Sequence, residues 1–155
     1  GDVYKRQEFI NSRFKEGKKI ENVLSKKTKG IEKIARSIQN MEKKTLNKRI
    51  KNYKNKIKNL IEDFDETRLD QEVAMLALKH DISEELDRIF FHTKTINEEL
   101  TKKTSSGKKI DFILQELFRE SNTLAVKIDD SKLKNYALDM KLLIEEMREQ
   151  TQNVE

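Results

Sequence analysis

The chain has 155 residues, of which 33 are Lys or Arg and 28 are Asp or Glu, so its formal net charge is +5. It contains no Cys, which excludes disulfides, thiolate metal sites and a Cys nucleophile. No apolar run approaches the roughly 18 residues that a membrane-spanning helix needs. With 4 Gly and no Pro, the turn residues of an all-β fold are missing, and we expect an all-α protein. No secretory signal is visible, because the N-terminus lacks an apolar h-region.

Charge is distributed unevenly along the chain. Residues 1–64 hold 19 basic and 8 acidic side chains, a net charge of +11, whereas residues 65–155 hold 14 basic and 20 acidic side chains, a net charge of −6. A basic segment of this kind favours a polyanionic partner such as nucleic acid. The alternative is an exposed basic helix that only keeps the chain in solution.

The basic segment is predicted to be one long helix or a helical hairpin. Its apolar residues follow the spacing of a coiled-coil seam, shifted once between Met41 and Leu46. The positions are Ile20, Leu24, Ile31, Ile34, Ile38, Met41, Leu46, Ile50, Tyr53, Ile57, Leu60 and Phe64. Because the stripe is narrow, the helix needs a second helix along it. We interpret residues 1–67 as a basic, coiled-coil-like arm.

Residues 68–79 form a different segment, in which apolar side chains surround most of the helix. We therefore expect this helix to be buried, with Arg68 and Glu72 paired one turn apart. A break is expected at His80 and Asp81, where Asp81 and Glu84 resemble a capping box.

Three amphipathic helices are predicted after the break, over residues 82–103, 108–126 and 132–152. Loops at 104–107 and 129–131 separate them. Their core faces contain Ile82, Leu86, Ile89, Ile96, Leu100, Ile110, Ile113, Leu114, Leu117, Phe118, Leu124, Ala125, Leu133, Tyr136, Ala137, Met140, Leu143, Ile144 and Met147. We expect residues 68–155 to form an all-α bundle that carries the arm of residues 1–67.

Each of these helices also carries an ordered polar stripe. On 82–103, Glu85, Arg88 and His92 lie one and two turns apart, so their heads can converge, and a His near a carboxylate could hold a proton near neutral pH. The alternative is a solvated ladder of ion pairs with a bystander His. On the last helix, Lys141, Glu145, Arg148, Glu149 and Gln152 lie together, where plain ion pairing is the alternative.

The helix of residues 108–126 has the most varied polar face. One line presents Lys108, Asp111, Gln115, Arg119 and Asn122. Beside it lie Glu116 and Glu120, a pair that could share Mg²⁺ or Mn²⁺ through oxygen ligands. Phe112 in the middle of this face could stack on a base or pack on a neighbour. Gly107, Lys108 and Lys109 at the helix start could accept a phosphate.

Several enzyme motifs are missing, including HExxH, the P-loop and GxSxG. Carboxylates, two His and guanidinium groups remain as candidate catalytic groups. Such groups suit phosphoryl chemistry, which depends on charge neutralisation and water activation.

Several motifs, in order, resemble the C-terminal domain of the YicC-like endoribonuclease family. They are Arg68–Ala74, Asp81–Arg88 with His92, Gly107–Glu116, Arg119–Leu124 with Lys127, and Met147–Glu155. The resemblance is dense over residues 68–155 and looser over about 8–67, and the family's N-terminal domain lies outside it. Departures from the family pattern are Phe91 for Ser, Leu117-Phe118 for Met-Asn, and Val126 for Ser.

The resemblance implies a bacterial, cytoplasmic endoribonuclease that cuts single-stranded or looped RNA with a divalent metal, in a homo-oligomer that is a hexamer in the family. We assign hypothetical roles to the polar stripes. Mg²⁺ or Mn²⁺ would be held by Glu116 and Glu120, with Asp111. A proton would be moved by His92, which Glu85 would orient, and the charge on the phosphate would be stabilised by Arg88 and Arg119. The RNA backbone would be held by the basic arm and by Lys108, Lys109, Lys127 and Arg148.

Two other functions stay open at this point. One is a non-catalytic RNA-binding or oligomerisation module, whose stripes join helices. The other is a coiled-coil assembly protein whose basic arm binds an acidic surface.

Overall fold

A computed structural model describes residues 2–60, 65–103 and 106–153, with side chains from residue 17 onward. Five helices make up these residues: α1 (Asp2–Leu60), α2 (Glu66–Lys79), α3 (Ser83–Thr101), α4 (Gly107–Lys127) and α5 (Ser131–Gln152). The described part of the chain contains no strand, which confirms the all-α prediction. None of its helices is long and apolar enough to cross a membrane.

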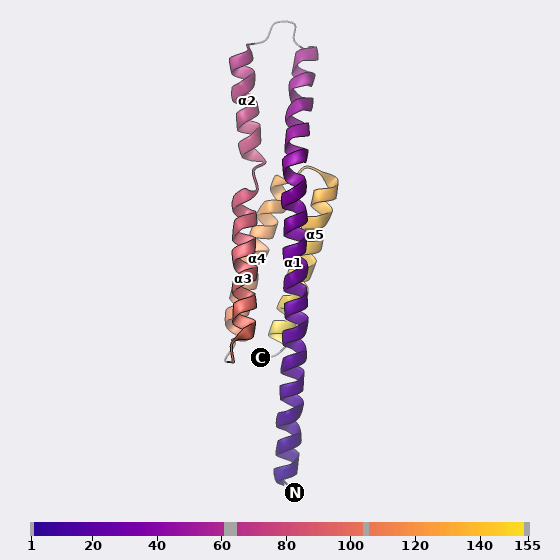
Figure 1. Cartoon of the computed structure of the whole chain (residues 1–155), viewed down its shortest axis with the longest axis vertical. Coiled ribbons are helices and arrows are strands. Elements are labelled where there is room, and N and C mark those ends of the chain that lie inside the picture. Colours follow the sequence, from indigo (N-terminus) through magenta and orange to yellow (C-terminus); the bar gives the residue numbers. More distant parts are fainter. Residues whose placement is uncertain (1, 61–64, 104–105, 154–155) are drawn as a thin grey trace.

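The helices form a bundle built along α1. In Figure 1, α2 and α3 follow one another along one side of α1, α4 lies beside α3, and α5 lies on the other side of α1. Helix α1 packs on α3 and α5, and α4 packs on the same two helices, so α1 and α4 lie on opposite corners. Helix α2 contacts α1.

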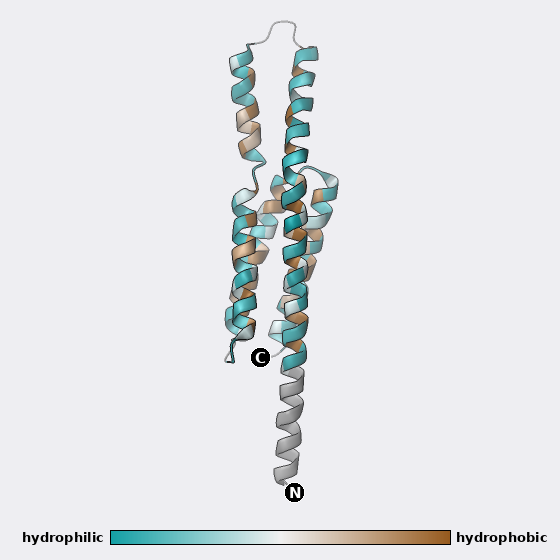
Figure 2. Ribbon diagram, in the orientation of Figure 1, coloured by the Kyte–Doolittle hydropathy of each residue, from teal (hydrophilic) through white to brown (hydrophobic). Residues whose placement is uncertain are grey.

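The core lies where α1, α3, α4 and α5 meet, and it consists of buried apolar side chains from all four helices. Figure 2 colours the ribbon by hydropathy, with hydrophobic residues in brown. From α1 it receives Leu24, Ile31, Ala35 and Ile38, all nearly or fully buried. Gly30 allows α1 to approach α5 closely, since a Cβ on it would lie 3.1 Å from Leu143 Cδ1. The middle of α1 is thus an integral helix of the bundle. The predicted division between residues 67 and 68 stays a prediction, although the core crosses it.

The two ends of α1 extend past the bundle (Figure 1). Residues 2–60 form the single helix α1, and α2 packs against it as a hairpin partner. After the shift at Met41, the seam residues Leu46, Ile50 and Ile57 are only half-buried, where α1 runs past the end of the bundle beside α2. Phe64, the last predicted seam position, lies outside the described residues.

The prediction that helix 68–79 is buried is wrong for this chain. In α2, Leu69 and Val73 are buried, whereas Met75 is 67% exposed and Leu78 is 73% exposed. Apolar side chains surround most of α2, but α2 packs on only one helix of the described structure, α1. One neighbouring helix can cover only one side of α2, so the apolar side chains on its other sides stay exposed. The predicted pair of Arg68 and Glu72 is not formed among the described ion pairs, and both side chains are exposed.

Short polar side chains begin most of the helices. Asp65 accepts the Thr67 N–H of α2 at 3.0 Å, and Asp130 accepts the Leu133 N–H of α5 at 3.0 Å. The predicted capping box of Asp81 and Glu84 does not form. Asp81 Oδ1 instead accepts both the N–H and the hydroxyl of Ser83, and these hydrogen bonds lower the pKa of Asp81.

His80 joins the hairpin to the bundle at the predicted break. Its Nδ1 lies 2.8 Å from the carbonyl oxygen of Lys127, at the end of α4. A carbonyl oxygen only accepts, so Nδ1 must carry the hydrogen. Its Nε2 faces Asp129 at 3.8 Å, and Arg49 of α1 approaches the same carboxylate at 3.6 Å. The turn between α4 and α5 is thereby fixed to α1 and to the end of α2.

Candidate active site

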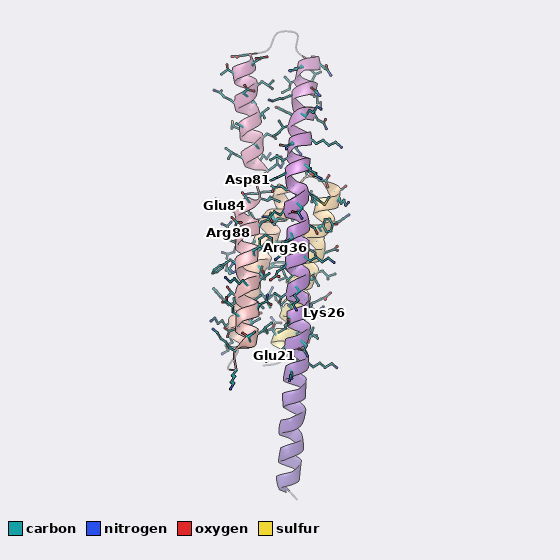
Figure 3. The ribbon with its side chains drawn as sticks, viewed as in Figure 1. Glu21, Lys26, Arg36, Asp81, Glu84 and Arg88 are labelled. Atoms are coloured by element: carbon teal, nitrogen blue, oxygen red, sulfur yellow. The ribbon has the colours of Figure 1, made fainter. Side chains whose placement is uncertain are left out.

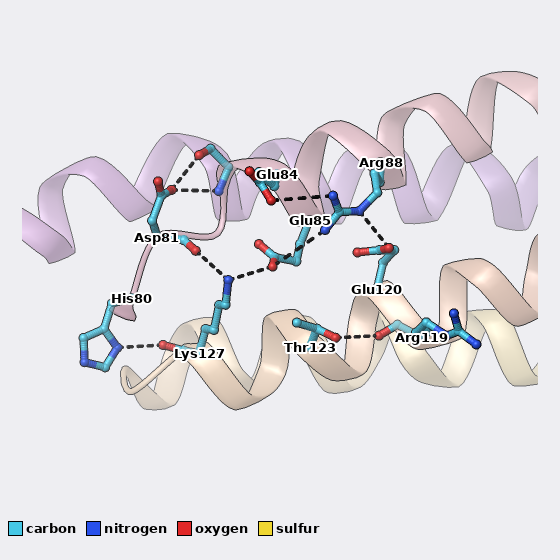
Figure 4. Close-up of polar contacts among 10 residues, drawn as sticks. His80, Asp81, Glu84, Glu85, Arg88, Arg119, Glu120, Thr123 and Lys127 are labelled. Carbon is cyan, nitrogen blue, oxygen red and sulfur yellow. Dashed lines mark hydrogen bonds and ion pairs between the residues drawn. The ribbon is translucent and has the colours of Figure 1, made fainter. Parts of the chain in front are cut away.

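Polar side chains from α3 and α4 meet along the line where these two helices pack. We call this line the α3–α4 seam. It comprises Glu85, Arg88, His92 and Glu99 of α3 and Lys109, Glu116, Glu120 and Lys127 of α4. Figure 4 shows part of it, with α3 and α4 running antiparallel and their side chains directed toward one another.

Glu85 lies at the end of the seam nearest the turns. Its side chain is 3% exposed, and its Oε1 accepts a hydrogen bond from Lys127 Nζ at 2.7 Å. The same ammonium group also donates to the carbonyl oxygen of Asp81 at 3.2 Å. The Lys127 ammonium therefore donates to two protein acceptors, the buried Glu85 carboxylate and the Asp81 carbonyl just before α3. RNA would have to compete with both acceptors for the predicted contact with Lys127. Glu85 Oε2 is buried without a hydrogen-bond partner.

Arg88 and Glu120 form the next contact along the seam. Arg88 Nε donates to Glu120 Oε1 at 2.8 Å, and this hydrogen bond raises the pKa of the guanidinium above its ordinary value. Arg88 also lies 3.9 Å from Glu85 and 3.7 Å from Glu84. The Arg88 side chain is 47% exposed, so it keeps one side open to a ligand while three carboxylates orient it.

Glu99 closes the other end of the seam. Its carboxylate accepts hydrogen bonds from Lys109 Nζ at 3.2 Å and from the Ser106 N–H at 3.4 Å, and Lys102 Nζ lies 3.3 Å away. Glu99 would thus compete with an external phosphate for the Lys109 ammonium at the start of α4. The Ser106 N–H that it accepts precedes the helix, and the Lys109 N–H of the first turn is bonded by the Ser106 hydroxyl at 3.5 Å.

We expect the contacts of Glu99 to make the fold sensitive to acid. Burial alone would raise the pKa of Glu99, but the hydrogen bonds from Lys109, Ser106 and Lys102 together lower it below its ordinary value of 4.5. A carboxyl whose pKa is lowered by folding contributes stability above its unfolded pKa, and this contribution is lost as the pH falls through the folded pKa. Glu99→Gln should therefore lower the urea midpoint at pH 7 more than at pH 3. Glu98→Gln, exposed at the next position, is the control, and an equal loss at both pH values for Glu99→Gln would contradict the assignment.

His92 lies in the middle of the seam. The pairs of Arg88 with Glu120 and of Glu99 with Lys109 show that α3 and α4 pack antiparallel, and from their register we infer that Glu116 is the residue of α4 opposite His92. Glu85, which we expected to orient His92, is turned to Lys127 and Arg88, and no hydrogen bond joins it to His92 among the described residues. The Glu85 side chain is buried and pairs with Lys127, whereas the Glu116 side chain is 30% exposed to solvent.

Around His92 and Glu116 the seam opens to solvent. Phe91 is 65% exposed and Phe112 is 64% exposed, and they lie on the outward sides of α3 and α4. The Phe91 and His92 rings meet edge to face, with centroids 5.7 Å apart. Arg119 is 75% exposed and its Nη1 lies 4.0 Å from Glu116. The centre of the seam thus combines an imidazole, a carboxylate, guanidinium groups and exposed aromatic rings.

The structure does not bring Asp111 or Arg148 to this seam. They pair with each other between α4 and α5, with Asp111 Oδ1 3.8 Å from Arg148 Nε, and Arg148 also pairs with Glu145 at 3.2 Å. The polar half of α4 is therefore divided between two neighbouring helices. Asp111 cannot join Glu116 and Glu120 as a ligand while it faces α5, and Arg148 is engaged by two carboxylates. Lys108 is exposed and remains available to solvent.

Glu116 and Glu120 fit a divalent cation in part. They lie one turn apart on α4, and Glu120 is paired with Arg88 through Oε1 only. Mg²⁺ is commonly held by one or two carboxylates, waters and substrate phosphates, which these two side chains could provide with RNA present. The described residues contain no group of three acidic or His side chains that could hold a metal by themselves. The metal therefore stays a prediction.

The sequence patterns did not predict a site on the flank of α3 that faces α1. There α3 and α1 leave an open groove of about 850 Å³, lined by polar side chains from both helices. Its residues look like ordinary surface positions on each helix taken alone, and only the packing of the two helices brings them together.

Comparisons with known proteins identify the family to which the chain belongs. The family model "Endoribonuclease YicC-like, C-terminal" matches residues 31–155. A "Probable endoribonuclease YicC" of Haemophilus influenzae is 34% identical over 148 residues, covering 96% of this chain and 52% of that protein. One of Clostridioides difficile with the same name is 36% identical over 153 residues, covering 92% of this chain and 50% of that protein. The chain spans about half the length of these relatives, and it belongs to the YicC-like endoribonuclease family.

Proposed function

We propose that this chain carries the catalytic part of an endoribonuclease, which cleaves phosphodiester bonds of single-stranded or looped RNA at the α3–α4 seam. The observation that supports the proposal is the exposure of several polar and aromatic side chains along the middle of the α3–α4 seam: Arg88 is 47% exposed, Glu116 is 30% exposed, and Arg119, Phe91 and Phe112 are exposed. Family membership supports the same conclusion, since the relatives are named probable endoribonucleases.

Each group at the centre has a chemical task in cleavage. His92 transfers a proton at the reacting phosphodiester, and Glu116 across the seam holds its ring in one orientation. Arg88 and Arg119 stabilise the negative charge that grows on the phosphate oxygens. Phe91 and Phe112 provide faces on which unpaired bases stack, which favours single-stranded over double-stranded RNA.

We further propose that Mg²⁺ or Mn²⁺ assists the reaction. Glu116 and Oε2 of Glu120 would hold it, and a bound divalent cation supplies a more acidic water and neutralises phosphate charge. Arg88 orients Glu120 through the bond to Oε1, so its removal would also disturb this pair.

The backbone of the RNA would be held mainly by cations at the edge of the seam and by α1. Lys108 is exposed at the start of α4, and α1 carries most of the basic residues of the chain. We also propose a homo-oligomer, in which a second copy covers the exposed apolar residues Met75 and Leu78 of α2.

The proposal is tested by incubating the chain with a 5′-labelled single-stranded RNA in Mn²⁺, in Mg²⁺ and in EDTA. We expect cleavage with a metal and a loss of at least about tenfold in EDTA and in Glu116→Gln and Glu120→Gln. Asp87→Asn is the matched control, because Asp87 is an exposed carboxylate on the solvent side of α3. The mass of the same sample in solution reports the oligomer.

The outcomes separate the proposal from its rivals. RNA binding without cleavage in either metal would favour a non-catalytic RNA-binding module, in which the ion pairs of the seam only join α3 to α4. A stable oligomer that neither binds nor cleaves RNA would favour an assembly protein. Cleavage that is unchanged in EDTA and in both Glu variants would refute the metal proposal and keep the nuclease.

A further inference from the structure

A second polar surface lies on the flank of α3 that faces α1, away from the seam. Between the two helices runs an open groove of about 850 Å³, within the size range of small-ligand sites. Asn97 Nδ2 donates to Glu32 Oε1 at 3.1 Å, which fixes the antiparallel register of the two helices. Arg36 and Gln39 of α1 and Phe90 and Thr93 of α3 line the same groove. In Figure 3, Arg36 on α1 lies near the level of Arg88 on α3.

The lining of this groove is unusual for two packed helices. None of its residues is aliphatic, although grooves within a bundle are ordinarily filled by such side chains. Three amide side chains, Gln39, Asn40 and Asn97, line it together with the half-buried ring of Phe90. Among the described residues, neither Gln39 nor Asn40 makes a side-chain hydrogen bond, so their donors and acceptors are available to a ligand.

The charges of the groove also point to a specific ligand. Arg36 and Lys94 are exposed, and no described carboxylate lies within 4.0 Å of either cation. Glu32 and Glu98 also line the groove, so it carries no net charge. A neutral groove is a poor general track for a polyanion, but it suits a ligand that has one phosphate and several hydrogen-bonding edges.

We propose that this groove binds one or two nucleotides of single-stranded RNA, outside the α3–α4 seam. One base packs on Phe90 and its edge bonds the amides of Asn40 and Asn97, while Arg36 and Lys94 hold the adjoining phosphate. Unstacked bases are recognised in this way, by aromatic faces and amide groups. The proposal rests on RNA being the substrate, and it adds a site that positions the strand without taking part in cleavage.

The test measures binding of a fluorescent single-stranded RNA to the whole chain in EDTA. We expect the double variant Arg36→Gln/Lys94→Gln to raise the Kd about tenfold or more. Its matched control is Lys132→Gln/Lys134→Gln, which removes the same charge from exposed positions of α5 outside the groove, and which should raise the Kd no more than about threefold.

A second pair of variants tests the base contact. Phe90→Leu should raise the Kd about tenfold because stacking is lost, whereas Phe90→Tyr should keep the wild-type Kd. Since Phe90 also packs on the core, a thermal melt of each variant checks that the fold is retained. A duplex RNA of the same sequence should bind alike to wild type and to Phe90→Leu, because its bases are stacked internally.

The results distinguish failure of this site from failure of the nuclease proposal. Equal Kd values for the groove and control double variants, with Phe90→Leu also unchanged, would refute the groove site even if the chain cleaves RNA. Binding that depends on the groove without cleavage would refute the nuclease and keep the site. A change in the mass of the groove variants in solution with an unchanged Kd would assign the groove to a second copy of the chain instead.

Discussion

Ile31→Ala should lower the free energy of unfolding by about 2–5 kcal/mol, the range observed when a large aliphatic side chain is removed from a packed core. Ile31 is fully buried in the middle of α1, where it packs with α3 and α5. The loss combines the transfer free energy of the deleted methyl and methylene groups with the cost of the cavity left behind. Urea unfolding followed by circular dichroism measures it.

The control for this prediction lies further along the same helix. Ile57 belongs to the same predicted seam but is only half-buried, beside α2. Ile57→Ala should therefore cost less than half as much as Ile31→Ala. Equal losses at the two positions would show that α1 is held along its whole length by similar packing, and would contradict the separation of a bundle segment from a hairpin segment.

His92→Gln should lower the rate of RNA cleavage by about 10²- to 10⁴-fold, the usual contribution of a general acid or base. Glu116→Gln should lower it as well, because the register of α3 and α4 places Glu116 opposite His92. If the two side chains act as one unit, the double variant should be no slower than the slower single variant. Initial rates under single-turnover conditions, compared with RNA affinity in EDTA, measure this coupling.

Two results would contradict this pairing. Rate losses that multiply in the double variant would show that His92 and Glu116 act separately. A coupling energy between His92 and Glu85 that exceeds the one between His92 and Glu116 would show that Glu85 orients His92, as the spacing along α3 predicted. Asp87→Asn again serves as the control and should leave the rate near that of the wild type.

Much of the bundle could be predicted from apolar spacing. The helices begin and end within a few residues of the predicted positions, and core residues such as Leu114 and Ile144 are buried as expected. These features depend on local periodicity, which the sequence contains directly. Phe118, which departs from the family pattern, packs against the core as predicted, and the Lys141 ammonium lies 5.6 Å from its ring centroid.

The relation between helices could not be predicted in the same way. Spacing along α3 suggested Glu85 as the neighbour of His92, because both lie on one flank of one helix. Contacts are set instead by how α3 packs on α4: Glu85 pairs with Lys127, and the pairing of Arg88 with Glu120 leads us to infer that Glu116 lies opposite His92. The groove between Arg36 and Lys94 depends likewise on the register of α1 and α3. In α2 the pattern of Met75 and Leu78 indicated burial without any indication of what would cover them.

The length of α1 makes it a lever. At 1.5 Å per residue its 59 residues extend about 90 Å, yet its fully buried side chains lie between Leu24 and Ile38. A tilt of about 5° at this short fulcrum would move a helix end about 45 Å away by about 4 Å. Small changes in the tilt of α1, at the place where it packs on α3 and α5, therefore cause larger displacements at both of its ends.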